Sequence, residues 1–188
     1  MNFFQKVFCS KLINENRELK RKLGVDFLTG LKNRFSYRGY IEGLFKKLSN
    51  KNNDIHYVFV DLDSFKEIND LKGHSVGDKV LKDVASILKD NLRSGDRVFR
   101  LAGDEFVIFF NRISKKDIKK RLISLQDKIV EKYPRGIKGG VSFGVYKIDF
   151  KNDTTQTVLD KADHLMYKSK HQGGNKIIFW DEVKKENE

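Results

Sequence analysis

Three carboxylates near the ends of expected strands are the residues best suited to chemistry. Asp104 and Glu105 lie between the apolar runs of "RLAGDEFVIFF", and Asp61 ends the run "IHYVFVD". Charges in a half-buried hairpin are costly unless something binds them. If the two strands are neighbours, the three carboxylates meet at one sheet edge. They would then suit Mg²⁺ or Mn²⁺, with phosphate and water as the remaining ligands.

Each carboxylate also has an ordinary explanation, because hairpin turns favour Asp and a strand can simply end in a polar residue. Taken together, the three favour a site where metal ions polarise a phosphate and activate an attacking oxygen. Gly103 would let backbone N–H groups approach a ligand closely. Cys9 is the single cysteine, so a metal must be bound by oxygen or imidazole.

The elements that position these residues follow from hydrophobic periodicity. Residues 55–63 are apolar on both faces up to Val60, which is typical of a central strand, and a loop to Gly77 is expected after them. Further strands are expected over residues 97–101, 106–110, 139–148 and 176–180. Helices are expected before residue 49, after Gly77, over about 118–133 and over about 155–171. This order predicts an α/β sandwich, with a mainly antiparallel sheet of about five strands flanked by helices.

The chain is long enough for one domain with a sizeable core. Its 188 residues include 39% hydrophobic and 12% aromatic side chains, a globular composition. No apolar run approaches the length of a membrane span, and no convincing signal peptide is present, so we expect a soluble, cytoplasmic protein. The expected parts are an N-terminal helical stalk (1–24), a domain (25–181) and a polar tail (182–188).

The stalk has the residue spacing of a short dimeric coiled coil. Its seam would consist of Cys9, Leu12, Asn16, Leu19 and Leu23. An amphipathic helix that folds back on its own domain fits the same spacing. Two heptads do not decide between these alternatives.

The net charge of +12 favours a polyanionic partner, such as nucleic acid, a phosphate-bearing small molecule or an acidic membrane surface. Because Lys and Arg are spread along the chain, often beside Asp or Glu, an ordinary solvated surface explains the same charge. The sequence contains no recognisable nucleic-acid-binding motif or basic stripe. We therefore do not expect nucleic acid to be the partner.

Several motifs in order give the sequence a specific resemblance. "RLAGDEF" resembles the signature of the GGDEF family, the diguanylate cyclases, and "DLDSFKEINDLKGHSVGD" (61–78) resembles its metal- and guanine-binding segment. "DFLTGLKNR", "VSFGV" and "ADHLMYKSKHQGGN" resemble its entry motif, late strand and phosphate-contacting helix. The resemblance extends from Asp26 to about Trp180. It implies a fold like that of nucleotide cyclases and polymerase palm domains.

The resemblance also implies an activity, in which two GTP molecules condense into cyclic di-GMP with release of pyrophosphate. Each protomer of a homodimer would bind one GTP with two Mg²⁺ or Mn²⁺ ions, so dimerisation would be required for catalysis. A parallel coiled coil in the stalk would bring the two domains together.

The resemblance assigns roles to individual residues. The catalytic metal ligands would be the side chains of Asp61, Asp104 and Glu105 and the backbone carbonyl of Leu62. The substrate-binding residues would be Asn69 and Asp78 at the guanine edge, Phe65, Lys66 and Lys170 along the phosphates, and Gly103 where the nucleotide approaches the backbone.

Some of these residues have a second explanation from the sequence alone. Asp78 stands three residues after Ser75, as in a capping box at a helix start. Asn69 is also a common turn residue, and Lys66 and Lys170 are also typical solvated charges.

The motif "RSGD" has the register of the family's inhibitory RxxD site. Asp96 lies six positions before Ala102, and Arg93 lies three positions before Asp96. The resemblance implies that Arg93 and Asp96 bind cyclic di-GMP and give product inhibition. A surface turn explains the same four residues.

Two positions depart from the family pattern. Ala102 replaces the first glycine of the signature, where a positive φ would strain alanine by ~1 kcal/mol. Gly174 stands where the family often has Arg, which removes one phosphate-binding cation. The alternative to an active enzyme is therefore a catalytically weak or inactive domain that binds GTP or cyclic di-GMP as a sensor or interaction module.

Overall fold

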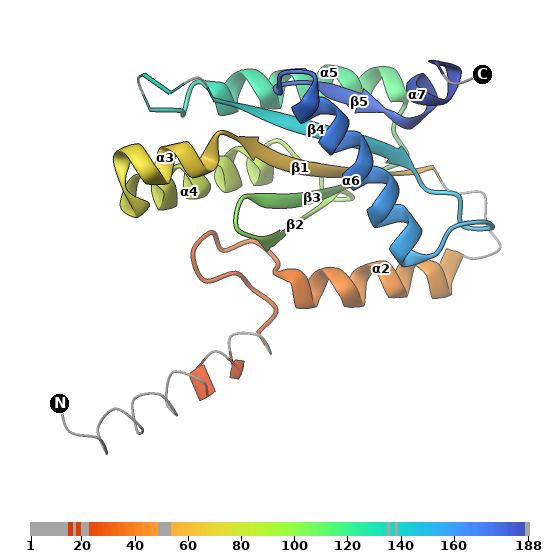
Figure 1. The fold of residues 1–188 in the computed structure, drawn as a ribbon. Coiled ribbons are helices and arrows are strands. Elements are labelled where there is room, and N and C mark those ends of the chain that lie inside the picture. Colours follow the sequence, from red (N-terminus) through yellow and green to blue (C-terminus); the bar gives the residue numbers. More distant parts are fainter. Residues whose placement is uncertain are drawn as a thin grey trace.

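A five-stranded sheet in the order β2-β3-β1-β4-β5 forms the centre of this computed structural model, which describes residues 15–16, 18–19, 23–48, 54–134, 136–137 and 139–186 (Figure 1). The strands are β1 (Ile55–Asp63), β2 (Arg97–Ala102), β3 (Glu105–Asn111), β4 (Gly140–Lys147) and β5 (Ile177–Phe179). The helices are α2 (Arg34–Leu48), α3 (Phe65–Lys72), α4 (His74–Asp90), α5 (Lys115–Val130), α6 (Thr155–His171) and α7 (Trp180–Glu186). Three strand pairs are antiparallel and β4–β5 is parallel, which confirms the predicted sheet.

Helices cover both faces of this sheet (Figure 1). On one face, Val58 and Val60 of β1 pack in a cluster with residues of α3, α4 and α5. On the other face, Tyr57 and Phe59 pack with residues of α2 and α6. All four side chains are buried, so β1 has the apolar surroundings that its sequence predicts for a central strand.

A hairpin, here called the signature hairpin, joins β2 and β3 with Gly103 and Asp104 in its turn. The strand register places Glu105 directly opposite Asp61 of β1. Gly103 has a φ of 45°, whereas Ala102 does not have a positive φ. The strain expected from a positive φ at Ala102 is therefore wrong, because the left-handed conformation falls on the glycine that follows it. The expected close approach of the Ala102 methyl to a nucleotide stays a prediction.

Two helices occupy the segment expected to be a loop, so that prediction is wrong. Ile68 is the one buried residue of α3, and this helix therefore has too little apolar periodicity to be predicted. The next helix, α4, begins at His74 after the N-cap Gly73. Ser75 is thus not an N-cap, and the capping-box explanation of Asp78 is also wrong.

The predicted N-terminal stalk and the predicted C-terminal tail have different outcomes. Leu19 and Leu23 are 59% and 72% exposed, whereas Cys9 and Leu12 lie outside the described residues. The coiled coil therefore stays a prediction. At the other end, α7 continues into the expected polar tail, where Val183 is buried. No helix in the described ranges is long and apolar enough to cross a membrane.

Gly144 lets α6 pack directly on β4. A Cβ atom at this position would lie 2.0 Å from the carbonyl oxygen of Ala162 and 2.6 Å from the amide nitrogen of Met166. Both atoms belong to the backbone of α6, so the helix and the Lys170 side chain that it carries would have to shift.

We predict that Gly144→Ala lowers the free energy of unfolding by about 1–3 kcal/mol, measured by urea denaturation. Gly39→Ala is the control, because Gly39 lies in α2 with no atom within 4 Å of its Cβ position. The control should raise stability by about 0.5–1 kcal/mol. Equal stability of the two variants would contradict the close packing of α6 on β4.

Candidate active site

Carboxylates that are buried or half-buried lie near the end of β1 and at the start of β3, at the same end of the sheet. Asp61 is 7% exposed, and its cross-strand partner Glu105 is half-buried, as is Asp104 in the adjoining turn. The structure thus brings together the three carboxylates that the sequence singles out. Leu62 follows in β1 with its side chain in the core, so it offers a ligand only its backbone.

The burial of these charges changes their protonation. The pKa of Asp61 is raised to about 7, first by desolvation and then by the charges of Asp104 and Glu105, against the lowering effect of Lys170. Desolvation likewise raises the pKa of Asp104 and of Glu105. Lys170 Nζ forms an ion pair with Asp61 Oδ1, yet this buried oxygen accepts no well-directed hydrogen bond. The site therefore has negative charge that a bound cation would balance.

The donors fit a hard divalent cation. Carboxylate and carbonyl oxygens are the ligands that Mg²⁺ and Mn²⁺ prefer, and among the described residues Asp61 Oδ1 has no partner except Lys170. Among the described residues, no three Asp, Glu, His or Cys side chains are already arranged around one ion position. Phosphate or water oxygens would have to complete the coordination, which is the usual arrangement for Mg²⁺.

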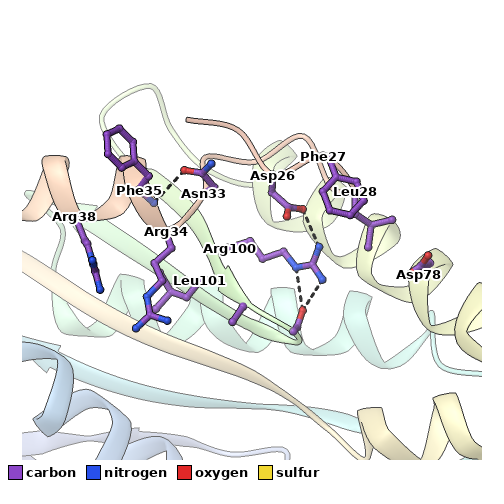
Figure 2. Close-up of a pocket in the computed structure, with 12 residues that line it drawn as sticks. Asp26, Phe27, Leu28, Asn33, Arg34, Phe35, Arg38, Asp78, Arg100 and Leu101 are labelled. Atoms are coloured by element: carbon purple, nitrogen blue, oxygen red, sulfur yellow. Dashed lines mark hydrogen bonds and ion pairs between the residues drawn. The ribbon is translucent and has the colours of Figure 1, made fainter. Parts of the chain in front are cut away.

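An ion pair, here called the Asp26–Arg100 tether, links the segment before α2 to the signature hairpin (Figure 2). Arg100 lies 2.8 Å from Asp26 and donates hydrogen bonds of 2.9 and 2.7 Å to the carbonyl oxygen of Gly103. Asp26 also accepts from the N–H and the hydroxyl of Thr29. Burial alone would raise the pKa of Asp26, but the hydrogen bonds from Thr29 and Arg100 hold it below its usual value. The sequence alone did not predict that Asp26 and Arg100 position the signature hairpin.

Asp63 anchors the loop that follows α6, and it was also missed. Its carboxylate accepts a hydrogen bond of 2.7 Å from the Ser142 hydroxyl and another of 2.7 Å from the backbone N–H of Asn175. A Cβ atom on Gly174 would lie 3.0 Å from this carboxylate, and Gly174 has a φ of 71°. This backbone conformation favours glycine, which accounts for the departure from Arg at position 174.

The predicted guanine-binding residues Asn69 and Asp78 lie on α3 and α4, the two helices that follow β1. Asn69 packs over Gly77, since a Cβ atom on Gly77 would lie 2.1 Å from Asn69 Oδ1 and 3.3 Å from the ring of Phe65. Asp78 and Lys66 are exposed. Asn69 and Phe65 are therefore held where α3 contacts α4. Asp78 lines the cavity described next.

A cavity of about 670 Å³ borders the signature hairpin (Figure 2). Asp78 of α4 lies at one end and Arg38 of α2 at the other, with the Asp26–Arg100 tether between them. Ala102 and Gly103 also line this cavity. Two of the predicted substrate-binding residues, Asp78 and Gly103, thus share one concave surface.

The predicted product-binding residues are placed differently from each other. Asp96 is buried, and its carboxylate accepts hydrogen bonds from the backbone N–H groups of Arg93 (3.1 Å) and Asn111 (3.2 Å). It also lies 3.5 Å from Arg121. Asp96 therefore holds the turn against β3, as the surface-turn explanation expects. Arg93 is exposed, and both it and Asp96 line a second cavity of about 330 Å³, together with Lys89.

The five-stranded mixed sheet with helices on both faces has the palm-like fold of nucleotide cyclases. The sequence profile described as "Diguanylate cyclase, GGDEF domain" matches residues 23–176, and the chain belongs to this family.

Two relatives of this chain are named as diguanylate cyclases, one of them as a probable one. Probable diguanylate cyclase DgcE of Escherichia coli K12 is 33% identical over 177 residues, which cover 90% of this chain and 16% of that protein. Diguanylate cyclase A of Treponema denticola is 30% identical over 169 residues, which cover 86% of this chain and 46% of that protein. The chain thus spans less than half of either relative.

Solved structures agree on the fold. The GGDEF domain of PA1120 from Pseudomonas aeruginosa has a TM-score of 0.69 at 29% identity, covering 82% of this chain and 93% of that chain. The coiled coil and GGDEF domain of DgcB from Caulobacter crescentus, solved in complex with c-di-GMP, has a TM-score of 0.77 at 22% identity. That match covers 93% of this chain and 95% of that chain.

The raised pKa of Asp61 predicts that stability depends on pH. A carboxyl group with a higher pKa in the folded state stabilises the fold below its unfolded pKa, and this contribution is lost as pH rises through the folded pKa. For Asp61 the range runs from 3.8 to about 7. In metal-free buffer, the free energy of unfolding should fall across this range, and in Asp61→Asn the fall should be smaller by roughly 1–3 kcal/mol.

Urea denaturation at several pH values in the presence of EDTA measures this difference. Asp127→Asn, which changes an exposed carboxylate in α5, is the control and should follow the wild-type profile. An Asp61→Asn profile that falls as steeply as the wild-type profile would contradict the raised pKa.

Proposed function

We propose that this chain is a diguanylate cyclase domain that condenses two GTP molecules into cyclic di-GMP and releases pyrophosphate. The observation that carries the proposal is the pairing of Asp61 with Glu105 across β1 and β3, with Asp104 in the adjoining turn. Family membership and the diguanylate cyclases among the relatives support the same reaction.

The carboxylates would hold two Mg²⁺ or Mn²⁺ ions per half-site, through Asp61, Asp104, Glu105 and the carbonyl of Leu62. These ions would neutralise phosphate charge and activate the attacking 3′-hydroxyl. Lys170 now provides the positive charge beside Asp61. With nucleotide bound, its ammonium group would turn to the terminal phosphates.

The rest of the first GTP would lie along α3 and α4. Phe65 and Lys66 stand in the first turn of α3, where unpaired backbone N–H groups favour phosphate. Asn69 and Asp78 would bind the guanine edge through an amide and a carboxylate. Gly103 would leave space for the nucleotide beside the signature hairpin.

The product contains two guanylyl units, so two half-sites must face each other. Each protomer of a homodimer would supply one GTP, and dimerisation would be part of the mechanism. Positioning of the two nucleotides would supply much of the acceleration. Product inhibition would act through the cavity lined by Arg93 and Asp96, which would bind cyclic di-GMP, while the carboxylate of Asp96 also holds the turn that carries Arg93.

Incubation with GTP and Mg²⁺, followed by mass analysis of the products, tests the proposed reaction. We expect cyclic di-GMP and pyrophosphate, with a loss of about a hundredfold or more in Glu105→Gln because a metal-binding charge is removed. Glu131→Gln, an exposed change after α5, is the control and should keep wild-type activity. Binding of GTP without turnover in the wild-type chain would select the alternative, a weak or inactive domain that acts by binding.

Gly77→Ala tests the placement of guanine without changing a substrate-binding side chain. Its Cβ atom would displace the amide of Asn69, and we expect the Kd for 3′-deoxy-GTP with Mg²⁺ to rise about tenfold through a lost hydrogen bond. Gly43→Ala is the control, because the space around Gly43 in α2 is open. An unchanged Kd in a folded Gly77→Ala protein would place the guanine elsewhere.

A further inference from the structure

Two arginines lie in the part of the 670 Å³ cavity that the proposed GTP site does not use. Arg34 and Arg38 are four residues apart on α2 and project in the same direction (Figure 2). They line the same cavity as Asp78 and Gly103. The concave surface therefore continues from the proposed guanine subsite to a second, cationic region.

These two guanidinium groups have no structural partner that explains them. Both side chains are exposed, and neither forms an ion pair or hydrogen bond with another residue in the part of the chain that the structure describes. Arg100 and Arg121 differ, since each lies against a carboxylate, Asp26 and Asp96 respectively. Arg34 and Arg38 thus remain available to an anionic ligand.

Arg34 lies beside the signature hairpin. It lines the cavity together with Ala102 and Gly103, the residues that directly precede Asp104 and Glu105 in the chain. Lys170 of α6 instead forms its ion pair with Asp61. The carboxylates therefore have a cation of α2 near the hairpin and a cation of α6 at β1.

The proposed reaction needs a second nucleotide at this place. The 3′-oxygen of one GTP forms a bond to the α-phosphorus of the other, the bond from that phosphorus to pyrophosphate breaks, and the hydroxyl proton passes to water. The first GTP is assigned to α3, α4 and Lys170. The cavity between α2 and the signature hairpin is used by that assignment only at Asp78 and Gly103, so its α2 end is open to the second nucleotide.

We propose that Arg34 and Arg38 bind the phosphate groups of the second GTP, the one that the facing protomer carries. Each guanidinium offers a planar fork of donors that matches phosphate oxygens, and two such groups one turn apart fit a triphosphate chain. This inference rests on the proposed function. It adds residues for the second nucleotide and explains two charges that the first nucleotide does not require.

The test separates binding of the first nucleotide from use of the second. Arg34→Gln/Arg38→Gln is compared with Lys46→Gln/Lys47→Gln, which removes the same charge from exposed positions at the other end of α2. Calorimetry of 3′-deoxy-GTP with Mg²⁺, on protein dilute enough to be monomeric by sedimentation, reports the first site because this nucleotide cannot attack. Pyrophosphate release from GTP, at concentrations where the wild-type chain dimerises, reports turnover.

We expect the arginine variant to lose turnover about tenfold or more while its Kd for 3′-deoxy-GTP changes less than about twofold. The lysine variant should keep both values. Arg34→Lys/Arg38→Lys, which keeps the charges but not the forked donors, should recover part of the turnover.

Two results would overturn the inference. The first is equal turnover in the arginine and lysine variants. The second is a rise in Kd in the monomeric arginine variant that matches its loss of turnover, since the arginines would then belong to the first GTP site. A wild-type chain that binds 3′-deoxy-GTP but makes no cyclic di-GMP refutes the proposed function, and the inference falls with it before any variant is compared.

Discussion

The burial of Asp61 beside two further carboxylates is the constraint on which the rest of the site depends. The register of β1 and β3 places Glu105 directly opposite Asp61, and the turn adds Asp104. Desolvation then raises the pKa of Asp61 to about 7, even with Lys170 beside it. An apolar residue would stabilise this strand end more, so the buried charge is best explained by a ligand that balances it.

The surrounding elements hold this strand end from several directions. The Asp26–Arg100 tether fixes the carbonyl of Gly103 and hence the turn of the signature hairpin. Close packing of α6 on β4 places Lys170 beside Asp61. The segment before α2 contacts the signature hairpin through this ion pair and through a backbone hydrogen bond of 2.9 Å from the N–H of Arg100 to the carbonyl oxygen of Lys32, so a movement of this segment would reach the hairpin. This gives a physical route by which the stalk would influence the site.

The sequence predicted the elements with strong apolar patterns and missed contacts between distant segments. β1 and α6 have the predicted bounds, because long apolar patterns and clear ends define them. α3 was missed since one buried residue, Ile68, leaves no periodicity to detect. The tether joins residues 74 positions apart, which no local pattern shows. The three carboxylates were proposed as metal ligands from residue types, and the structure places them together, whereas the roles proposed for Asn69 and Asp78 depend on the family resemblance.

A crystal structure of the chain with Mn²⁺ and 3′-deoxy-GTP tests the central claim most directly, because the anomalous scattering of manganese locates the ion independently of the protein atoms. We predict manganese bound by the side chains of Asp61 and Glu105, with nucleotide phosphates completing its coordination and Lys170 turned from Asp61 to a phosphate. Manganese and nucleotide bound away from these carboxylates, with Asp61 still paired to Lys170, would contradict it.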